Sequence, residues 1–168
     1  MANLSQIETY LKKQKIPFKV IDLGRKVYTV EGVKATGINA NDIVKTLVVR
    51  VGVKRQRQSL KLTQQGLSSF IVLVLKGEDR VDFGKCRKMF GNKCELAKQQ
   101  EVLKVTGVPV GAVCPVLLDI PIYIDMKVMD LANVNMGSGN LKKGLGMKLS
   151  DLLNSLIDYQ VIDVSSSV

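Results

Sequence analysis

The sequence contains no histidine and only three cysteines in 168 residues. Without histidine, the chain cannot form a Ser-His or Cys-His nucleophile pair, and it cannot bind a metal ion through imidazole. The cysteines, Cys86, Cys94 and Cys114, include no CxxC pair, so neither a disulfide framework nor a zinc knuckle is predicted. We therefore expect reduced thiols, no metal and no cofactor, and any catalysis has to use other groups.

Long apolar runs are absent as well. No segment reaches the roughly 18 apolar residues of a membrane-spanning helix, and the start, MANLSQIETYLKKQ, lacks the basic head and apolar body of a secretory signal. We expect a cytoplasmic protein with no membrane contact. The length suits one domain with its own core, which we place at residues 1–163. The tail VSSSV, residues 164–168, is expected to be disordered.

Positive charge is abundant, with 25 Lys and Arg against 15 Asp and Glu and a net charge of +10. Such an excess favours a polyanionic partner through counterion release. Part of it lies in residues 51–66, a polar insertion without helical periodicity that predicts a basic hairpin or a long loop. Two interpretations stay open for this segment, RNA binding or a solvated hairpin. Its basic residues are Lys54, Arg55, Arg57 and Lys61.

Helix caps and stops predict short helices. Asn3, with Gln6 placed for a capping box, starts a helix that Pro17 ends. By the same signals, helices are expected at residues 30–36, 82–89 and 99–105, and Ser150 is expected to cap the last one.

The β-branched and apolar segments predict strands at residues 17–23, 43–53, 69–75 and 120–125. NMGSGN, residues 135–140, is expected to form a tight glycine-rich turn. Strands and short helices alternate irregularly, which does not fit a doubly wound parallel sheet. The fold class predicted is therefore α+β, a single domain with a mixed, strongly curved sheet and short flanking helices.

Taken singly, the candidate functional residues each have an ordinary explanation. Lys45 interrupts an apolar strand, which is typical of a charge on the solvated face. The GxxxP pattern from Gly111 to Pro115 is typical of a turn, and the glycine-rich segment 135–139 can bind an anion or simply reverse the chain. Cys114 has no histidine to activate it, which favours a packed thiol.

Their order along the chain is more specific. DIVKTLVVRV is followed by FIVLVLKGEDRVDFGK, VTGVPVGAVCP, LLDIPIYID, VNMGSGN and SDLL. This order resembles the YbaK/prolyl-tRNA synthetase editing-domain family over nearly the whole chain. The resemblance implies a free-standing enzyme that hydrolyses the ester between an amino acid and the 3′ end of a mischarged tRNA. Ala- or Cys-tRNA(Pro) is the substrate that the family suggests, with prolyl-tRNA synthetase as a possible partner.

The resemblance also implies a site. The lysine of the VKTL-like motif, which matters most for activity in the family, corresponds to Lys45. The GxxxP loop matches Gly111 and Pro115, and its backbone amides would bind the amino acid and polarise the ester carbonyl. Two features differ, since GSGN at 137–140 replaces a GxRG-like turn and segment 51–66 is longer than usual. Further substrate-binding positions are Thr46, Ala112, Asp125, Asn135, Gly137, Ser138 and Gly139.

A mechanism without histidine is available because an aminoacyl ester is already activated. Water can attack it if the terminal ribose hydroxyl serves as the base and the oxyanion is stabilised, while Lys45 holds the terminal phosphate or ribose. Two alternatives are a non-catalytic tRNA-binding or synthetase-associated module of the same fold and a basic adaptor for other RNA. The sequence does not decide among them.

Overall fold

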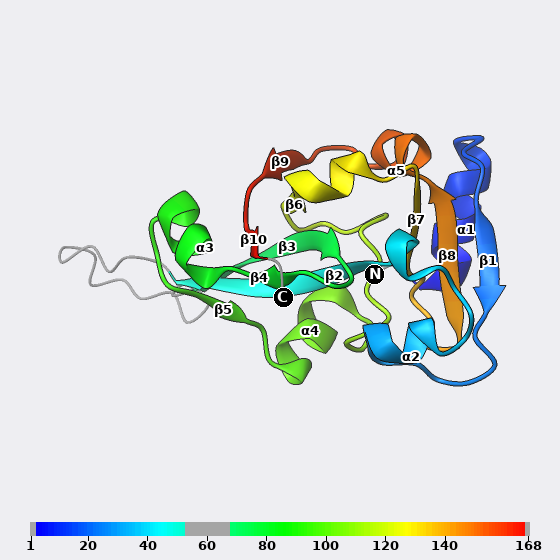
Figure 1. The fold of residues 1–168 in the computed structure, drawn as a ribbon, viewed down its shortest axis with the longest axis horizontal. Coiled ribbons are helices and arrows are strands. Elements are labelled where there is room, and N and C mark those ends of the chain that lie inside the picture. Colours follow the sequence, from blue (N-terminus) through cyan, green and yellow to red (C-terminus); the bar gives the residue numbers. More distant parts are fainter. Residues whose placement is uncertain (1–2, 53–67, 167–168) are drawn as a thin grey trace.

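The computed structural model describes residues 3–52 and 68–166, which form an α+β domain built on a mixed sheet (Figure 1). The main sheet has five strands in the order β5-β2-β3-β6-β9. Both β3 and β5 run antiparallel to β2, whereas β6 runs parallel to β3 and β9 runs parallel to β6. The predicted α+β class, mixed sheet and short helices are confirmed. The strands are β2 (Val44–Gly52), β3 (Ser68–Lys76), β5 (Cys94–Leu96), β6 (Ile122–Asp125) and β9 (Gln160–Ile162).

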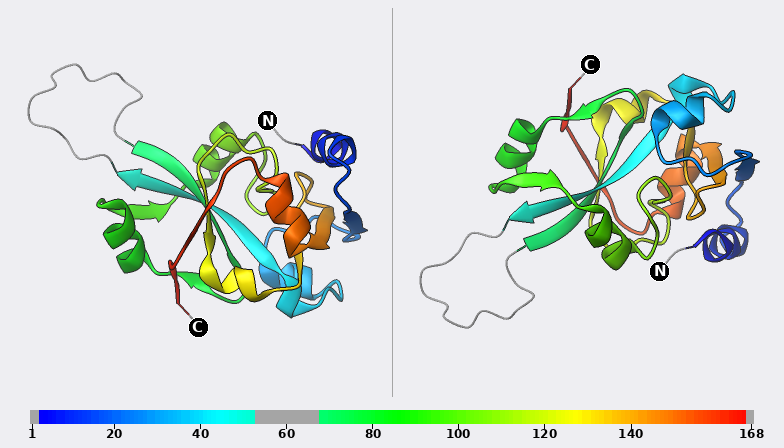
Figure 2. Two further views of the ribbon diagram at one scale, coloured as in Figure 1. Left: turned by 90° about the horizontal axis from the view of Figure 1, so that it is seen from above. Right: turned by 90° about the horizontal axis from the view of Figure 1, so that it is seen from below.

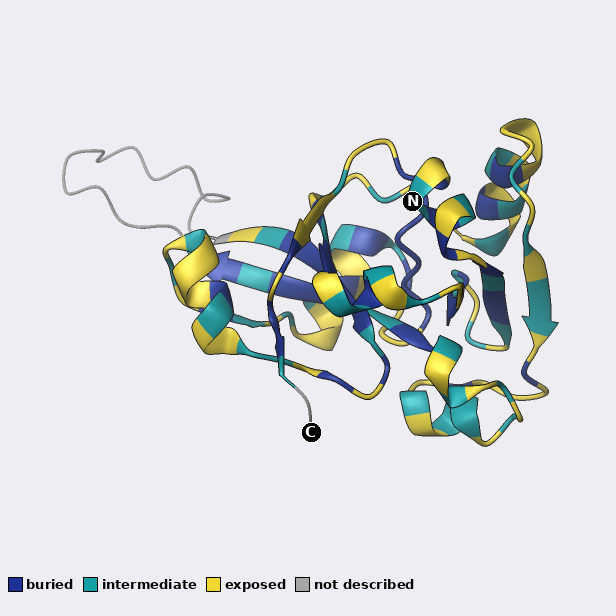
Figure 3. Cartoon of the chain, turned by 45° about the horizontal axis from the view of Figure 1, so that its top comes forward, coloured by how far each residue is buried: buried dark blue, intermediate teal, exposed yellow. Residues whose placement is uncertain are grey.

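The central pair β2 and β3 is buried on both faces. Val44 and Val48 of β2 pack in one apolar cluster, whereas Val49 and Val51 pack in the other. A strand covered on both sides has apolar residues at successive positions, which explains the long β-branched run. These strands are accordingly among the most buried in the molecule (Figure 3).

A second, antiparallel sheet joins β1 (Lys19–Asp22), β8 (Lys143–Lys148) and β7 (Asn133–Gly137). An isolated bridge between Ile43 and Asn135 connects it to the start of β2. The helix α1 (Leu4–Lys13) lies with β1 at one end of the molecule, whereas α3 (Phe83–Phe90) and β5 lie at the other (Figure 1, Figure 2). The second sheet therefore closes off the end of β2 that carries Lys45.

Local capping signals place most helices correctly. Asn3 and Gln6 form the predicted capping box of α1, and Thr29 caps α2 (Val30–Lys34). Gly91 and Gly107 end α3 and α4 (Gln99–Thr106) with φ of 71° and 77°, the left-handed conformation that favours glycine. Two 3-10 helices, η1 (Ala40–Asp42) and η2 (Met126–Asp130), complete this set. Among the described residues, no helix is long and apolar enough to cross a membrane.

Two local expectations are wrong. Ser150 does not cap the last helix, because it lies inside α5 (Leu149–Ser155), and the cap residue, Lys148, makes no side-chain cap hydrogen bond. A backbone bond from the Leu149 N–H to the Ala132 carbonyl holds this start instead. The glycine-rich turn is also shorter than expected, since residues 135–137 belong to β7 and pair with β8.

The tail is ordered further than expected. Val164 and Ser165 are 0% and 1% exposed, and β10 (Ser165–Ser166) pairs with β4 (Arg80–Val81). The prediction that disorder begins at residue 164 is therefore wrong for residues 164–166. Small polar residues look like a free tail in sequence, but here a buried carboxylate binds their backbone, as described below.

Candidate functional site

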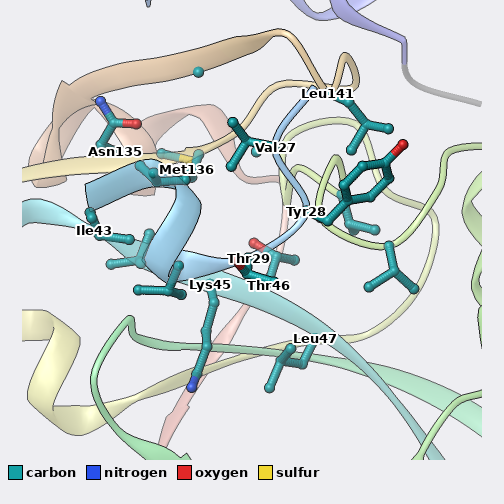
Figure 4. Close-up of a pocket in the computed structure, with 18 of the residues that line it drawn as sticks. Val27, Tyr28, Thr29, Ile43, Lys45, Thr46, Leu47, Asn135, Met136 and Leu141 are labelled. Atoms are coloured by element: carbon teal, nitrogen blue, oxygen red, sulfur yellow. The ribbon is translucent and has the colours of Figure 1, made fainter. Parts of the chain in front are cut away.

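A cavity of about 290 Å³ lies between the first half of β2, the GxxxP loop and the β7–β8 hairpin (Figure 4). Its walls are mainly apolar and include Val27, Val113, Met136 and Leu141. The structure thus brings segments that are far apart in sequence to one place. The lining includes five of the residues predicted from the sequence: Lys45, Thr46, Gly111, Asn135 and Gly137.

The cavity runs along an edge of β2 that has little strand pairing. β3 pairs with the whole of β2 on one side, but on the other side β5 pairs only with residues 49–51. The Ile43 carbonyl accepts a bond from Gly77 on the β3 side, and the Val48 carbonyl accepts one from Ala97 on the β5 side. Because backbone groups alternate between the two edges of a strand, the N–H and C=O of Thr46 point to the β5 side, where that strand has already ended.

The Thr46 side chain adds a second free group. Its Oγ1 atom is buried and has no hydrogen-bond partner in the described structure. A buried hydroxyl left without a partner costs about 1–3 kcal/mol. Since Thr46 lines the cavity, a ligand or water in the cavity can supply the missing partner.

Lys45 leaves β2 on the opposite face from Thr46, as alternate residues of a strand do. Figure 4 shows its side chain pointing away from Tyr28, Met136 and Asn135. Burial lowers the pKa of Lys45, the negative charge of Asp79 partly offsets that effect, and Arg80 reinforces it. Within the described structure no acidic oxygen lies within 4 Å of its ammonium. Lys45 is therefore a partly desolvated cation at the border of the cavity.

The GxxxP loop needs its glycine for internal packing. Gly111 has φ of 92°, and a Cβ atom there would lie 2.8 Å from both the Cα and the carbonyl oxygen of Tyr28. The close neighbour is thus the backbone of Tyr28, so the loop needs a glycine here to pack against that backbone. The Ala112 N–H donates to the Pro109 carbonyl at 3.0 Å. Among the hydrogen bonds between described residues, none uses the N–H of Gly111 or Val113.

The β7–β8 turn packs against this loop on the side away from the cavity. The Gly139 N–H donates to the Ala112 carbonyl at 2.7 Å. The Ser138 hydroxyl is fully buried and donates to the Lys143 carbonyl at 2.6 Å. A Cβ atom at Gly137 would lie 2.4 Å from the Val113 carbonyl oxygen. The structure therefore places Ala112, Ser138 and Gly139 behind the wall of the cavity rather than in its lining.

Asp125 lies elsewhere and has other partners. It is fully buried, and its Oδ1 accepts the backbone N–H groups of Val164 and Ser165 at 3.0 and 3.1 Å. Its Oδ2 accepts the Ser165 hydroxyl at 2.8 Å and the Lys127 N–H at 3.2 Å. The carboxylate thus anchors the C-terminal strand and caps η2.

Pro115 is separate from the site as well. It lines a second cavity of about 360 Å³, together with Tyr10 and Tyr159. The four basic residues predicted to bind RNA, Lys54, Arg55, Arg57 and Lys61, lie outside the described residues.

Several lining residues were not expected from the sequence. Tyr28 lines the cavity and is 55% exposed, and Val27 and Leu141 contribute apolar surface. The Thr29 cap marks the start of a helix but carries no information about what its flanking residues face. The sequence offers one signal for these lining residues, which is a tyrosine directly before such a cap.

The cysteines lie away from any activating group. All three are buried and unpaired. Burial raises the pKa of Cys114 to about 12 and that of Cys86 to about 11, and it also raises the pKa of Cys94. The thiols therefore stay protonated at neutral pH and are poor nucleophiles. In the part of the chain that the structure describes, no cluster of three or more Cys, Asp or Glu side chains could hold a metal ion.

Known proteins with the same fold share nearly the whole architecture. The hypothetical protein APE2540 superposes with a TM-score of 0.77 and 25% identity, covering 95% of this chain and 99% of that one. A second structure is described as a proposed trans-editing enzyme for prolyl tRNA synthetase. It has a TM-score of 0.75 and 24% identity, and the match covers 98% of this chain and 97% of that one.

Sequence comparisons agree. The uncharacterized protein YwhH of Bacillus subtilis is 28% identical over 118 residues, which are 69% of this chain and 74% of that protein. The proline–tRNA ligase of Caldicellulosiruptor saccharolyticus is 32% identical over 114 residues, which are 67% of this chain and 17% of the ligase. The aminoacyl-tRNA editing domain matches residues 25–154. The chain therefore belongs to the family of aminoacyl-tRNA editing domains.

Proposed function

We propose that this protein hydrolyses the ester bond of a mischarged tRNA after a separate synthetase has released it. The observation that carries the proposal is the cavity beside the free edge of β2. Unused hydrogen-bonding groups from Thr46 and the Gly111 loop lie in the cavity wall, and a cation lies at its border. These groups together suit a ligand whose small polar part enters the cavity while a larger anionic part stays at its border.

The amino acid occupies the cavity in this proposal. Its volume of about 290 Å³ is close to the lower limit of about 300 Å³ for ligand pockets, which favours a small side chain. The substrate that we propose, alanine or cysteine on proline tRNA, is supported by the likeness to a proline–tRNA ligase. Prolyl-tRNA synthetase is the corresponding candidate partner.

The proposed hydrolysis follows from which backbone N–H groups have no acceptor and from the lack of an activated nucleophile. The N–H groups of Gly111 and Val113 have no acceptor among the described residues and are the candidate donors to the oxyanion. The cysteines are held as thiols and histidine is absent. Water therefore attacks the carbonyl, and the neighbouring ribose hydroxyl accepts the proton of the water while it passes its own proton to the departing ribose oxygen. The ester C–O bond then breaks and releases the free amino acid and the tRNA 3′ end. No covalent intermediate with the protein is required.

Lys45 serves the tRNA rather than the amino acid. Its side chain leaves β2 away from Tyr28 and Met136, so its ammonium lies outside the part of the cavity that these residues line (Figure 4). A lysine ammonium is a compact charge that suits a phosphate. In the proposed complex it binds the terminal phosphate or ribose and fixes the position of the ester.

The test is a single-turnover deacylation screen over a complete panel of mischarged tRNAs, including Ala- and Cys-tRNA(Pro). We expect at least one tRNA to lose its amino acid much faster than in buffer. Rates equal to buffer across the panel, with tRNA still bound, would show a non-catalytic tRNA-binding module instead. Equal competition by unrelated RNA would show a general RNA adaptor.

A further inference from the structure

Asp79 is a buried carboxylate that the proposed reaction does not use. It is 8% exposed, and its Oδ2 atom is buried without a hydrogen bond in the described structure. The same oxygen lies 3.6 Å from the Nζ atom of Lys127, at ion-pair distance. Burying a carboxylate is costly unless cations or donors compensate it. Lys127 supplies such a cation, but no described group donates a hydrogen bond to this Oδ2 atom.

The turn that carries Asp79 is fixed against the start of β2. The Gly77 N–H donates to the Ile43 carbonyl at 2.7 Å, and the Asp79 N–H donates to the Lys76 carbonyl at 3.1 Å. Gly77 is tightly enclosed, since a Cβ atom there would lie 2.9 Å from the Cγ2 atom of Ile43. The position of Asp79 relative to the lysine two residues after Ile43 is thus set by backbone contacts.

Lys45 extends to this same side. In Figure 4 its side chain runs from β2 towards the segment that follows β3. The charges that act on it are Asp79, which attracts the ammonium, and Arg80, which repels it. Glu78 points elsewhere and pairs with Lys34 at 3.1 Å. Lys127 faces Asp79 from η2. Asp79 is thus the acidic group that supports a positive charge on Lys45.

We propose that Asp79 is a positioning residue for Lys45: its buried carboxylate, paired with Lys127, keeps the Lys45 ammonium charged and directed at the border of the cavity. The proposal rests on the proposed function, in which Lys45 contacts the tRNA. Asp79 itself touches no substrate and acts through Lys45. Burial opposes the charge of Lys45, and Asp79 opposes the effect of burial.

The experiment compares Asp79→Asn with Glu78→Gln, which removes the neighbouring charge that pairs with Lys34. The pKa of Lys45 is measured by NMR on protein labelled at the lysine Cε atoms, with the signal assigned through Lys45→Arg. We expect Asp79→Asn to lower the pKa of Lys45, because burial and Arg80 then act unopposed, and Glu78→Gln to leave it unchanged. A shift of one unit reduces the charged fraction about tenfold at pH values above both pKa values.

The same variants are assayed for deacylation between pH 6 and 8.5. In Asp79→Asn the single-turnover rate should fall, and its loss at high pH should begin at a lower pH than in the wild type. Asp79→Glu, which keeps the charge, should restore the pKa and part of the rate. In a Lys45→Gln background, Asp79→Asn should have no further effect on the rate.

Both readouts have to change for the proposal to stand. A folded Asp79→Asn protein with a wild-type pKa at Lys45, or with a wild-type rate, overturns it. If Asp79→Asn does not fold, Asp79→Ser provides the same neutral replacement. The NMR readout needs no substrate, so a wild-type protein that deacylates nothing contradicts the proposed function, whereas an unshifted pKa contradicts the link between Asp79 and Lys45.

Discussion

The folded protein shields the charged ammonium of Lys45 from part of the solvent. Its pKa is lowered in the folded state, chiefly by burial, so the folded protein binds this proton less tightly than the unfolded chain does. By linkage, the charge opposes folding below the folded-state pKa, and this cost disappears as pH rises towards the unfolded pKa. A lysine at such a position is better explained by binding than by stability.

The replacement Lys45→Met should separate these two roles. It keeps most of the length of the side chain and removes the charge, so we expect most of the deacylation rate to be lost while the thermal midpoint at pH 7 stays the same or rises. The same substitution at Lys104, an exposed residue of α4, is the control and should change neither. A wild-type rate for folded Lys45→Met would contradict the role of Lys45.

Gly111 has a positive φ and also a close contact with the Tyr28 backbone. A comparison with Gly91 separates the effects of these two features. Gly111→Ala places a Cβ atom 2.8 Å from the Tyr28 backbone at φ of 92°. Gly91 also has a positive φ, 71°, but nothing lies within 4 Å of an added Cβ. Gly91→Ala should therefore cost about 1 kcal/mol of unfolding free energy from conformation alone, and Gly111→Ala should cost more because backbone atoms have to move.

The two glycine variants are compared by urea unfolding and by single-turnover deacylation. Loss of one aligned oxyanion donor typically lowers turnover by about 100-fold to 1000-fold, so displacement of the loop by Gly111→Ala should reduce the rate far more than Gly91→Ala. Equal unfolding free energies for the two variants would contradict the close contact with Tyr28. A wild-type rate for folded Gly111→Ala would show that the loop is a plain turn.

At the scale of elements, what the sequence predicts depends on how local the signal is. Caps such as Asn3, Thr29 and Asp82 act within three residues, and all three helices start where they indicate. Strands of two or three residues, such as β4, β5 and β10, exist only through their partners and leave no periodic signal. Ser150 failed as a cap because a bond from the Leu149 N–H to the Ala132 carbonyl holds the helix start.

The same reasoning applies to the site. Lys45, Thr46 and Gly111 could be placed together only through the resemblance, because the cavity joins β2 to a loop more than sixty residues away along the chain. Asp125 was predicted to bind the substrate, but its actual partners near the C-terminus also lie far away along the chain. A carboxylate that follows an apolar strand looks the same in sequence whether it binds a ligand or the backbone of a distant strand.

The anchoring role of Asp125 gives a prediction for β10. Asp125→Ala removes the acceptor of two buried backbone N–H groups, one buried hydroxyl and the partly buried Lys127 N–H, and each buried donor left unpaired costs about 1–3 kcal/mol. We expect a loss of roughly 3–5 kcal/mol of unfolding free energy, together with faster hydrogen exchange at Val164 and Ser165. Ser165→Ala, which removes only the hydroxyl, should cost about 1 kcal/mol. Unchanged exchange at Val164 in folded Asp125→Ala would contradict the anchor.

At the scale of the whole molecule, affinity and chemistry are expected to come from different groups. In the proposed complex the net charge of +10 attracts the tRNA phosphates, whereas the cavity that we assign to the ester is small and mainly apolar. Salt should therefore weaken tRNA binding and raise the tRNA concentration needed for half-maximal rate. It should leave the rate at saturating tRNA nearly unchanged, because ions compete for phosphates rather than for the oxyanion donors.

The basic segment provides the sharpest test of this separation. Each phosphate contact contributes about 0.7–0.9 to the slope of log affinity against log salt concentration, so replacing four contacting residues by glutamine should flatten the slope by up to about 3.6. The residues to replace are Lys54, Arg55, Arg57 and Lys61. An equal loss of charge on exposed residues in and after α1 is the control, and these are Lys12, Lys13, Lys15 and Lys19. If the segment binds phosphates, its variant should lose more slope than the control while both keep the wild-type rate at saturating tRNA. Equal slopes in the two variants would mean that only the net charge matters and that the segment is a solvated part of the surface.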